Sequence, residues 1–278
     1  ITITHDVALA RRLGGQVAIM LDGRVVEQGP AGEVLARPQH AYSRELVQAD
    51  PANWDPMPHA LPGQRQAVVA GTQLAKAFGR QRLFDAVDLS VDAGEIVAIP
   101  GPSGCGKTTL GHILLGLERA DRGQVHRPAS QRPWSFQKLY QDPPAAFAPQ
   151  RSLRDSLRDL VARHRLSLTD GQELMRTLRL GDGLLDRLPS QVSGGELQRF
   201  ALLRVLLMKP AFVFADEPGS RLDPVTQKRT MQLLNDCADA QRFGVLLVTH
   251  DAQVAARGAH RVQHIDFVRA AVDHNHAP

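Results

Sequence analysis

Short runs of apolar residues, separated by polar turns, recur along this 278-residue chain. Residues 95–99, 211–215 and 244–249 are nearly all apolar, which predicts strands of a parallel sheet covered on both faces. Residues 68–78 and 83–91 alternate between apolar and polar positions, so we expect further strands there. Leucines at helical spacing among the Arg and Asp residues of 150–180 predict a helical insertion. We therefore expect an α/β fold.

The first 50 residues carry a smaller pattern of their own. Residues 1–4 (ITIT) are typical of the end of a buried strand, and Asp22-Gly23 is a hairpin turn signal. We expect a short helix between these two features and a second helix over residues 31–48. Residues 51–65 hold four prolines and no apolar period, which predicts a linker.

Three residues near the start, Thr4-His5-Asp6, recur near the end as Thr249-His250-Asp251. Both copies follow β-branched or aliphatic residues and continue with a short helical stretch and an apolar strand, which ends in Asp22 or Asp266. The separation is too long for a solenoid. The repeat favours two homologous domains in tandem, the first present only as its C-terminal remnant at residues 1–50. A chance match of three residues is the alternative.

Composition narrows the function classes. The net charge is +4, and acidic residues interrupt nearly every basic stretch, so no nucleic-acid partner is expected. Two cysteines, Cys105 and Cys237, cannot build a zinc cluster or a disulfide scaffold, which favours a reducing compartment. We expect neither a signal peptide nor a transmembrane helix, because the apolar runs are too short to span a bilayer, and we expect any work at a membrane to be done from outside the bilayer.

A phosphate-binding loop is the first chemical motif. Gly101–Thr108 (GPSGCGKT) fits G-x-x-x-x-G-K-[ST] between a predicted strand and a predicted helix, which makes a chance glycine-rich turn the weaker interpretation. Its backbone amides and the helix start can surround phosphate oxygens. Lys107 can supply a positive charge to the β- and γ-phosphates, and the Thr108 hydroxyl can coordinate Mg²⁺.

Two further motifs fit the same chemistry. Asp216 and Glu217 end an apolar strand, where Asp216 would hold Mg²⁺ and Glu217 would act as general base towards a water molecule. Ser193-Gly194-Gly195 opens a long predicted helix and offers a second anion-binding helix start. Taken alone, the Asp216-Glu217 pair and the Ser-Gly-Gly segment each also have a purely structural interpretation. Within one chain, the helix start at the phosphate loop and the helix start at Ser193 cannot both reach the same triphosphate. They could do so if two copies of the chain met head to tail.

The order of these motifs, with Gln141-Asp142-Pro143, Asp223 and Thr249-His250-Asp251, resembles the ATP-binding subunits of ABC transporters over about residues 67–266. The resemblance implies a P-loop NTPase cassette over residues 66–278. Such a cassette has a mainly parallel sheet core flanked by helices, an antiparallel β subdomain and a helical subdomain at about 142–195. It also implies ATP and Mg²⁺ as ligands, and ATP hydrolysis coupled to transport.

The resemblance implies a role for each of several individual residues. Gln141 would sense the γ-phosphate and metal, His250 would contact the γ-phosphate, and Phe78, 29 residues before Lys107, would stack on adenine. The implied catalytic residues are Glu217, His250, Gln141 and Lys107, and the implied metal ligands are Thr108, Gln141 and Asp216. The implied nucleotide-binding residues are Phe78, Gly101, Ser103, Gly104, Cys105, Gly106, Lys107, Thr108, Thr109, Ser193, Gly194, Gly195, Glu196 and Asp223, with Ser193 to Glu196 and Asp223 facing the opposite subunit.

The chain departs from the family pattern at several positions. Glu196 stands where Gln is usual, although an acid in the first turn of a helix is favoured by the helix dipole. Gly219 and Arg221 stand where Thr and Ala are common, and Arg221 is expected to alter pairing across the dimer interface. Cys105 lies inside the phosphate loop, so we expect its reaction with thiol reagents to abolish ATPase activity and ATP to protect it.

Two stretches narrow the resemblance to ATPases of dipeptide, oligopeptide and nickel importers: residues 28–51 and 141–153. This implies a second cassette, fused upstream or separate, integral membrane permease subunits and, indirectly, an extracytoplasmic solute-binding protein. The expected location is the cytoplasmic face of the inner membrane, as a peripheral protein. His5 would be the switch histidine of the first cassette. The histidines of 273–276 are compatible with nickel binding but fit a solvated tail better.

Two other function classes stay open. The first is a non-transport ABC ATPase in a soluble multi-subunit complex, for example of the carbon–phosphorus lyase type, which would co-purify with enzyme partners and not with a permease. The second is an inactive regulatory cassette, which the complete set of Lys107, Asp216, Glu217 and His250 disfavours.

Overall fold

A five-stranded parallel sheet forms the centre of the computed structural model, which describes residues 1–57, 66–128, 132–220 and 222–268. Its order is β10-β5-β9-β8-β7. The strands are β10 (Arg261–Val262), β5 (Ile96–Pro100), β9 (Gly244–Thr249), β8 (Phe212–Asp216) and β7 (Phe136–Leu139). All neighbouring pairs are parallel, as the apolar runs predicted. The carboxyl ends of these strands therefore meet at one edge of the sheet.

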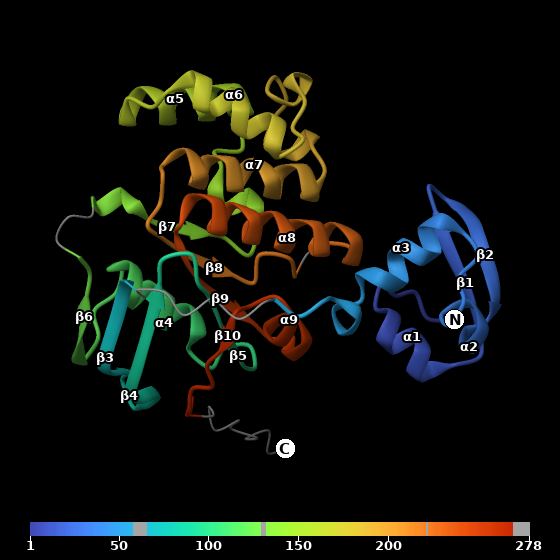
Figure 1. The fold of residues 1–278 in the computed structure, drawn as a ribbon, viewed down its shortest axis with the longest axis horizontal. Helices are drawn as coiled ribbons and strands as arrows, with labels where there is room; N and C mark the ends of the chain where they lie inside the picture. The colour runs from blue at the N-terminus through green and yellow to red at the C-terminus, as the bar shows by residue number, and fades with distance from the viewer. Residues whose placement is uncertain (58–65, 129–131, 221, 269–278) are drawn as a thin grey trace, which may run out of the picture.

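Both faces of this sheet are covered, and β8 shows how. Phe212 and Phe214 face a core shared with α4 (Lys107–Leu115) and a three-stranded antiparallel sheet, whereas Val213 and Ala215 face the opposite core. The antiparallel sheet comprises β4 (Gln81–Asp92), β3 (Ala67–Phe78) and β6 (Arg122–His126). The opposite core is closed by α7 (Gly194–Leu207) and α8 (Pro224–Gln241), as Figure 1 shows.

The close approach of α4 to β8 depends on Gly111. A Cβ at this position would lie 2.3 Å from the ring of Phe214. The missing side chain lets the helix lie directly on the sheet, which brings the first turn of α4 beside the end of β8.

Helices α5 (Leu153–His164) and α6 (Leu168–Thr177) form a further layer over α7 (Figure 1). Ser152 and Ser167 cap their N-termini by accepting hydrogen bonds from backbone amides. Short 3₁₀ turns lie at Pro133–Ser135, Pro143–Ala146, Asp182–Leu184 and Pro189–Gln191. The expected helices of 150–180 are thus present. Among the described residues, no helix combines the length and the apolar character needed to cross a membrane.

The first 50 residues fold around a small core of their own, formed by Val7, Ile19, Ala31, Val34 and Leu35. They contain α1 (Val7–Leu13), β1 (Gln16–Leu21), β2 (Arg24–Pro30), α2 (Ala31–Val34) and α3 (Ala41–Ala49). The hairpin turn forms as predicted, with Asp22 and Gly23 both at positive φ (49° and 76°).

Three details of the expected secondary structure are wrong. Residues 1–4 form no strand, because no strand among the described residues pairs with them, and Ile1 and Ile3 are exposed. The helix expected over 31–48 is split into α2 and α3, because Pro38 lacks an amide hydrogen and disfavours helix before it. The strand expected to run to Asp266 ends at Val262, since its neighbour β5 soon ends at Pro100, which has no donor.

The segment expected to be a linker starts with an anchor. Trp54 follows a 3₁₀ turn (Pro51–Asn53), is buried in the core beside α9 (Ala252–Arg257), and donates a hydrogen bond from Nε1 to the carbonyl of Ala49 (2.9 Å). Residues 58–65 of the expected linker lie outside the described residues. Polar contacts join α3 to α8: Lys228 Nζ donates to the carbonyl of Gln48 (2.9 Å), and Arg229 pairs with Glu45.

Candidate nucleotide-binding and catalytic site

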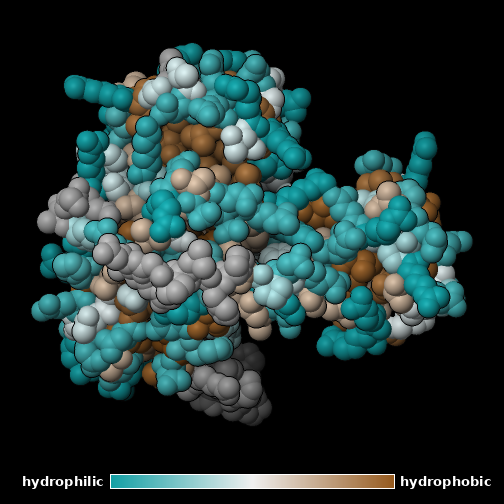
Figure 2. All heavy atoms as spheres, in the orientation of Figure 1, coloured by the Kyte–Doolittle hydropathy of each residue, from teal (hydrophilic) through white to brown (hydrophobic). Residues whose placement is uncertain are grey.

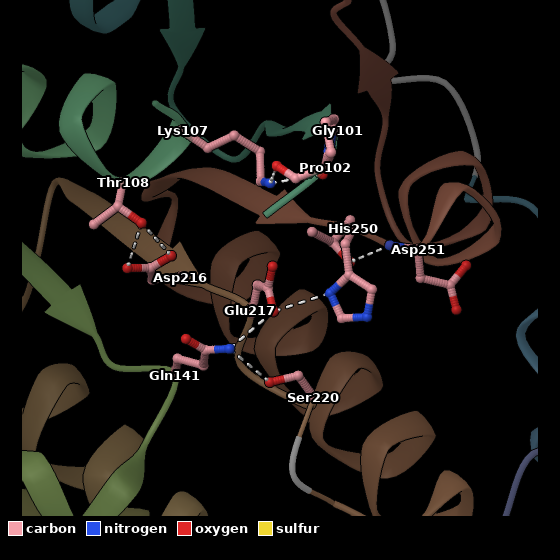
Figure 3. A network of polar contacts seen from close by, with 11 residues as sticks. Gly101, Pro102, Lys107, Thr108, Gln141, Asp216, Glu217, Ser220, His250 and Asp251 are labelled. Carbon is pink, nitrogen blue, oxygen red and sulfur yellow. Dashed lines mark hydrogen bonds and ion pairs between the residues drawn. The ribbon is translucent and has the colours of Figure 1, made fainter. Parts of the chain in front are cut away.

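The loop between β5 and α4 has the backbone of a phosphate-binding loop. Gly104 (φ 76°) and Gly106 (φ 117°) lie in the left-handed region, which favours glycine. Lys107, the first residue of α4, is buried, and its ammonium donates hydrogen bonds to the carbonyls of Gly101 (2.6 Å) and Pro102 (2.7 Å), as Figure 3 shows. A full positive charge is therefore held at the loop, close to the start of the helix.

Thr108 and Asp216 form the pair that could hold a metal ion. The Thr108 hydroxyl lies 3.2 Å from each carboxylate oxygen of Asp216, the last residue of β8 (Figure 3). Hydroxyl and carboxylate oxygens are hard donors that suit Mg²⁺, which usually takes its other ligands from phosphate and water. The donor set therefore fits the expected ion.

Lys138, in β7, is a site residue that the sequence analysis missed. Its Nζ lies 3.0 Å from Oδ2 of Asp216 and 3.0 Å from Nε2 of His112 in α4. Burial, together with the neighbouring Lys138 ammonium, holds the pKa of His112 below its ordinary value. A lysine three residues before Gln141 was the available signal, but its partner on another strand could not be identified from the sequence.

Glu217 is the centre of the second cluster. It is 9% exposed, and its Oε2 accepts a hydrogen bond from Nε2 of Gln141 (2.9 Å) and lies 3.0 Å from Nδ1 of His250. Figure 3 shows these side chains converging on the carboxylate, with Ser220 beside Gln141 (3.4 Å). Glu217 also has φ 46°, a strained backbone for a residue with a side chain, and such strain is concentrated at functional sites. This arrangement can accept a proton from a positioned water molecule.

The Ser-Gly-Gly corner is a separate surface. Ser193 and Glu196 form a reciprocal cap: the Ser193 hydroxyl and amide donate to Oε2 of Glu196 (2.7 and 2.9 Å), and the Glu196 amide donates to the Ser193 hydroxyl oxygen (3.3 Å). These hydrogen bonds hold the pKa of Glu196 below its ordinary value. Gly195 lies against Thr226, whose amide donates to Oδ1 of Asp223 (3.0 Å), so the start of α7 and the start of α8 lie side by side.

Within the described part of the chain, no hydrogen bond or ion pair joins this corner to the phosphate loop or to Glu217. The structure therefore brings together Lys107, Thr108, Gln141, Asp216, Glu217 and His250, but not Ser193 to Glu196 or Asp223. Gly194, like Gly195, lies at the start of α7.

The remaining expected positions are spread around the loop. Ser103 and Gly104 are exposed, Thr109 is half-buried, and Cys105 is buried against Gly101. Phe78 ends β3 and is 53% exposed, and Lys76 Nζ lies over its ring at 5.1 Å from the centroid. Arg221 and residues 273–276 lie outside the described residues.

The two copies of the His-Asp repeat line one groove, which the sequence analysis also missed. A cavity of about 460 Å³ beside Glu217 is lined by Ser220 and His250 and, on another side, by His5 and Asp6. Asp6 caps α1 as Asp251 caps α9, each through a carboxylate oxygen that accepts from a backbone amide (2.8 and 2.7 Å). The two helix starts therefore have similar caps, although Thr249 ends strand β9 and residues 1–4 form no strand.

A larger cavity of about 1090 Å³ lies away from these residues, between α6, α7 and α8. Its apolar lining includes Leu174, Leu178 and Leu206, and Figure 2 shows hydrophobic side chains in the hollow between the α5–α6 layer and α7. The lining of this cavity includes none of the site residues that the sequence motifs predicted.

Comparisons with known proteins agree with this geometry. The ABC transporter family model matches residues 84–220. The chain is 38% identical over 205 residues to the aliphatic sulfonates import ATP-binding protein SsuB 1 of Nocardia farcinica, covering 74% of this chain and 80% of that protein. It is 35% identical over 207 residues to the nickel import ATP-binding protein NikE of Escherichia coli, covering 67% and 75%.

A longer match is with the peptidoglycan transport ATP-binding protein YejF of Agrobacterium fabrum, 30% identical over 280 residues. It covers 91% of this chain, which spans 50% of that protein. Among solved structures, a dimeric ATP-binding cassette bound to ADP and phosphate matches with TM-score 0.60 and 25% identity, over 71% of this chain and 94% of that one. The chain belongs to the ATP-binding proteins of ABC transporters and carries their ATPase domain.

Proposed function

We propose that this chain binds ATP with Mg²⁺ at the 101–108 loop and hydrolyses it with Glu217 as general base. One observation carries the proposal: Gln141 Nε2 (2.9 Å) and His250 Nδ1 (3.0 Å) both contact Oε2 of Glu217, beside the loop that holds Lys107. Three strand ends supply these groups. An ATPase needs a positive charge, a metal-holding carboxylate and a base at one place.

Each residue has a role in the proposed reaction. Lys107 binds the β- and γ-phosphates, and Thr108 and Asp216 hold Mg²⁺, which supplies charge neutralisation at the phosphates. Water attacks the γ-phosphorus, its proton passes to Glu217, and the bond to the ADP oxygen breaks. Gln141 and His250 hold the carboxylate and orient the water. Phe78 stacks on the adenine.

Closure of the site is proposed to need a second cassette. The corner from Ser193 to Glu196, together with Asp223, lies on a surface separate from the loop of its own chain. A partner's corner would complete each site, so that two ATP molecules lie between two cassettes. Hydrolysis would then remove the contacts that hold the cassettes together.

We further propose that residues 1–50 are the C-terminal end of a first cassette, followed by a linker (51–65) and the second cassette (66–278), with its helical subdomain at about 142–195. Two observations support this. A match that covers 91% of the chain has to include part of residues 1–50. The His5-Asp6 and His250-Asp251 copies also have similar helix caps, in which each Asp accepts a hydrogen bond from the amide three residues on (2.8 and 3.2 Å).

The proposed biological role is import of peptides, nickel or a related small solute, with membrane permease subunits and, indirectly, an extracytoplasmic solute-binding protein. The chain would lie peripherally at the cytoplasmic face of the inner membrane. The relatives named above act in sulfonate import, nickel import and peptidoglycan transport, which supports the general role and leaves the solute open.

The test is hydrolysis of ATP by the purified protein together with its companion cassette and magnesium, and affinity capture of partners from its own cells. We expect magnesium-dependent hydrolysis that is lost in Lys107→Ala and kept in Lys209→Ala, since Lys209 pairs with Asp170 away from the loop. A captured permease supports transport. If the protein hydrolyses ATP but captures only enzyme partners that are not membrane proteins, the importer role is rejected. The proposed ATPase activity would still stand.

A further inference from the structure

A positive charge already lies on the carboxylate that is proposed to face Mg²⁺. Lys138 Nζ lies 3.0 Å from Oδ2 of Asp216, and the two side chains are only 12% and 10% exposed. The residues lie on adjacent parallel strands, where Lys138 pairs with Phe214, two positions before Asp216. The ion pair is therefore built into the sheet.

The Lys138 ammonium is held from several sides. His112 Nε2 lies 3.0 Å away, and the rings of Tyr140 and Phe214 have their centroids 5.0 and 5.4 Å from Nζ. A cation enclosed by aromatic rings, a ring nitrogen and a carboxylate loses these contacts if it swings towards solvent. Lys138 thus stays beside Asp216 when a ligand binds nearby.

We propose that Lys138 is a positioning residue that sets the Mg²⁺ requirement of the site. It orients and neutralises Asp216, and its charge opposes a divalent ion on the same carboxylate. Mg²⁺ therefore binds well only together with the negative charge of the triphosphate. This inference rests on the ATP and Mg²⁺ site proposed above.

The size of the effect follows from Coulomb's law. A monovalent and a divalent cation that share one carboxylate lie within several ångströms of each other in a partly buried site, where like charges repel strongly. We expect removal of the Lys138 charge to increase the Mg²⁺-induced gain in nucleotide affinity by about tenfold or more. A merely structural role would weaken binding with and without Mg²⁺ to the same degree.

The experiment uses Lys138→Met in the whole chain, with a fluorescent ATP analogue titrated in excess EDTA and in excess Mg²⁺. The expected result is a rise of about tenfold in the ratio of the two affinities, and tighter binding of Mn²⁺ alone, measured by electron paramagnetic resonance. Lys209→Met is the matched control, because it removes an ammonium from an ion pair of similar length (2.9 Å, with Asp170) elsewhere.

An unchanged or smaller ratio in Lys138→Met would overturn the inference. If Lys138→Met does not fold, Lys138→Gln replaces it, because this variant keeps a polar side chain without the charge. The ratio of nucleotide affinities with and without Mg²⁺ then tests the inference in the same way. Absence of nucleotide binding by the wild-type chain would instead remove the proposed function, and this inference with it.

Discussion

Nδ1 of His250 lies 3.0 Å from Oε2 of Glu217, although the two residues are 33 positions apart in the chain. His250 follows β9 and Glu217 follows β8, which are adjacent parallel strands. Parallel neighbours end at the same edge of a sheet, so the two side chains meet without any contribution from distant loops. The contact fixes a buried carboxylate in one orientation.

Substituting His250→Ala should slow hydrolysis and leave nucleotide binding intact. The Glu217 carboxylate would lose one of its two partners, whereas Lys107 and Thr108 would be untouched. We expect turnover to fall by about 100-fold, with nucleotide affinity within about twofold of wild type. Steady-state hydrolysis and equilibrium binding measure the two quantities. His126→Ala, on β6, is the control, and unaltered turnover in His250→Ala would contradict the positioning role.

Gly111→Ala should destabilise the fold. The new methyl group would lie 2.3 to 2.4 Å from the Phe214 ring, and overpacking of this kind costs about 1–3 kcal/mol, more than alanine gains in helix propensity. Thermal unfolding should show a lower Tm. The control is Gly32→Ala in α2, where a Cβ meets nothing within 4 Å, and an equal Tm change in both variants would argue against the close packing of α4 on β8.

Glu196→Ala should weaken the start of α7, while Glu196→Gln should not. The alanine variant keeps the bond from the residue 196 amide to the Ser193 hydroxyl but loses both bonds that the Glu196 carboxylate accepts from Ser193, at a cost of about 0.3–1.5 kcal/mol, whereas a Gln side chain can still accept from the Ser193 amide. Chemical denaturation at neutral pH measures the difference. Hydrolysis by Glu196→Gln should stay close to wild type.

The Glu196 cap should also depend on pH. The pKa of Glu196 in the folded chain lies below its ordinary value of 4.5, so its stabilising effect is complete above that value and is lost as the pH falls through the lower folded pKa. The stability difference between wild type and Glu196→Ala should therefore shrink in acid. A difference that grows in acid would contradict the cap.

Thiol modification should act through Cys105 alone. Burial raises the pKa of Cys237 to about 11, so this thiol stays protonated near neutral pH. Cys105 lies in the phosphate loop against Gly101 and is buried, so we expect slow labelling that abolishes hydrolysis and is slowed further by ATP. Mass spectrometry and activity follow both events, and Cys105→Ser should be resistant. Full activity after complete labelling of Cys105 would reject the prediction.

The sequence could predict which side chains lie close together where strand order alone decides it. Asp216 ends an apolar strand and Glu217 and His250 directly follow one, and parallel strands bring such residues together without knowledge of side-chain packing. The phosphate loop was predictable for a similar reason, because its glycine positions reflect backbone conformations that other residues rarely adopt. The α/β fold followed from the same apolar runs.

Other features depend on contacts between distant residues. The Lys138–Asp216 ion pair and the groove shared by His5 and His250 require a known strand register and a known packing of the first 50 residues. The expected strand at residues 1–4 failed because a strand exists only where a neighbour supplies hydrogen bonds. Trp54 was missed because one buried residue in a proline-rich stretch leaves no periodic signal.

The central claim, that Glu217 is the base acting on ATP held at the Lys107 loop, is tested most directly by Glu217→Gln. The measurement combines ATP binding, hydrolysis and assembly state in one preparation with the companion cassette, with Glu173→Gln on α6 as control. We expect Glu217→Gln to bind ATP as wild type does, to lose turnover by at least about 100-fold, and to accumulate as an ATP-bound dimer. Wild-type turnover in Glu217→Gln would contradict the account.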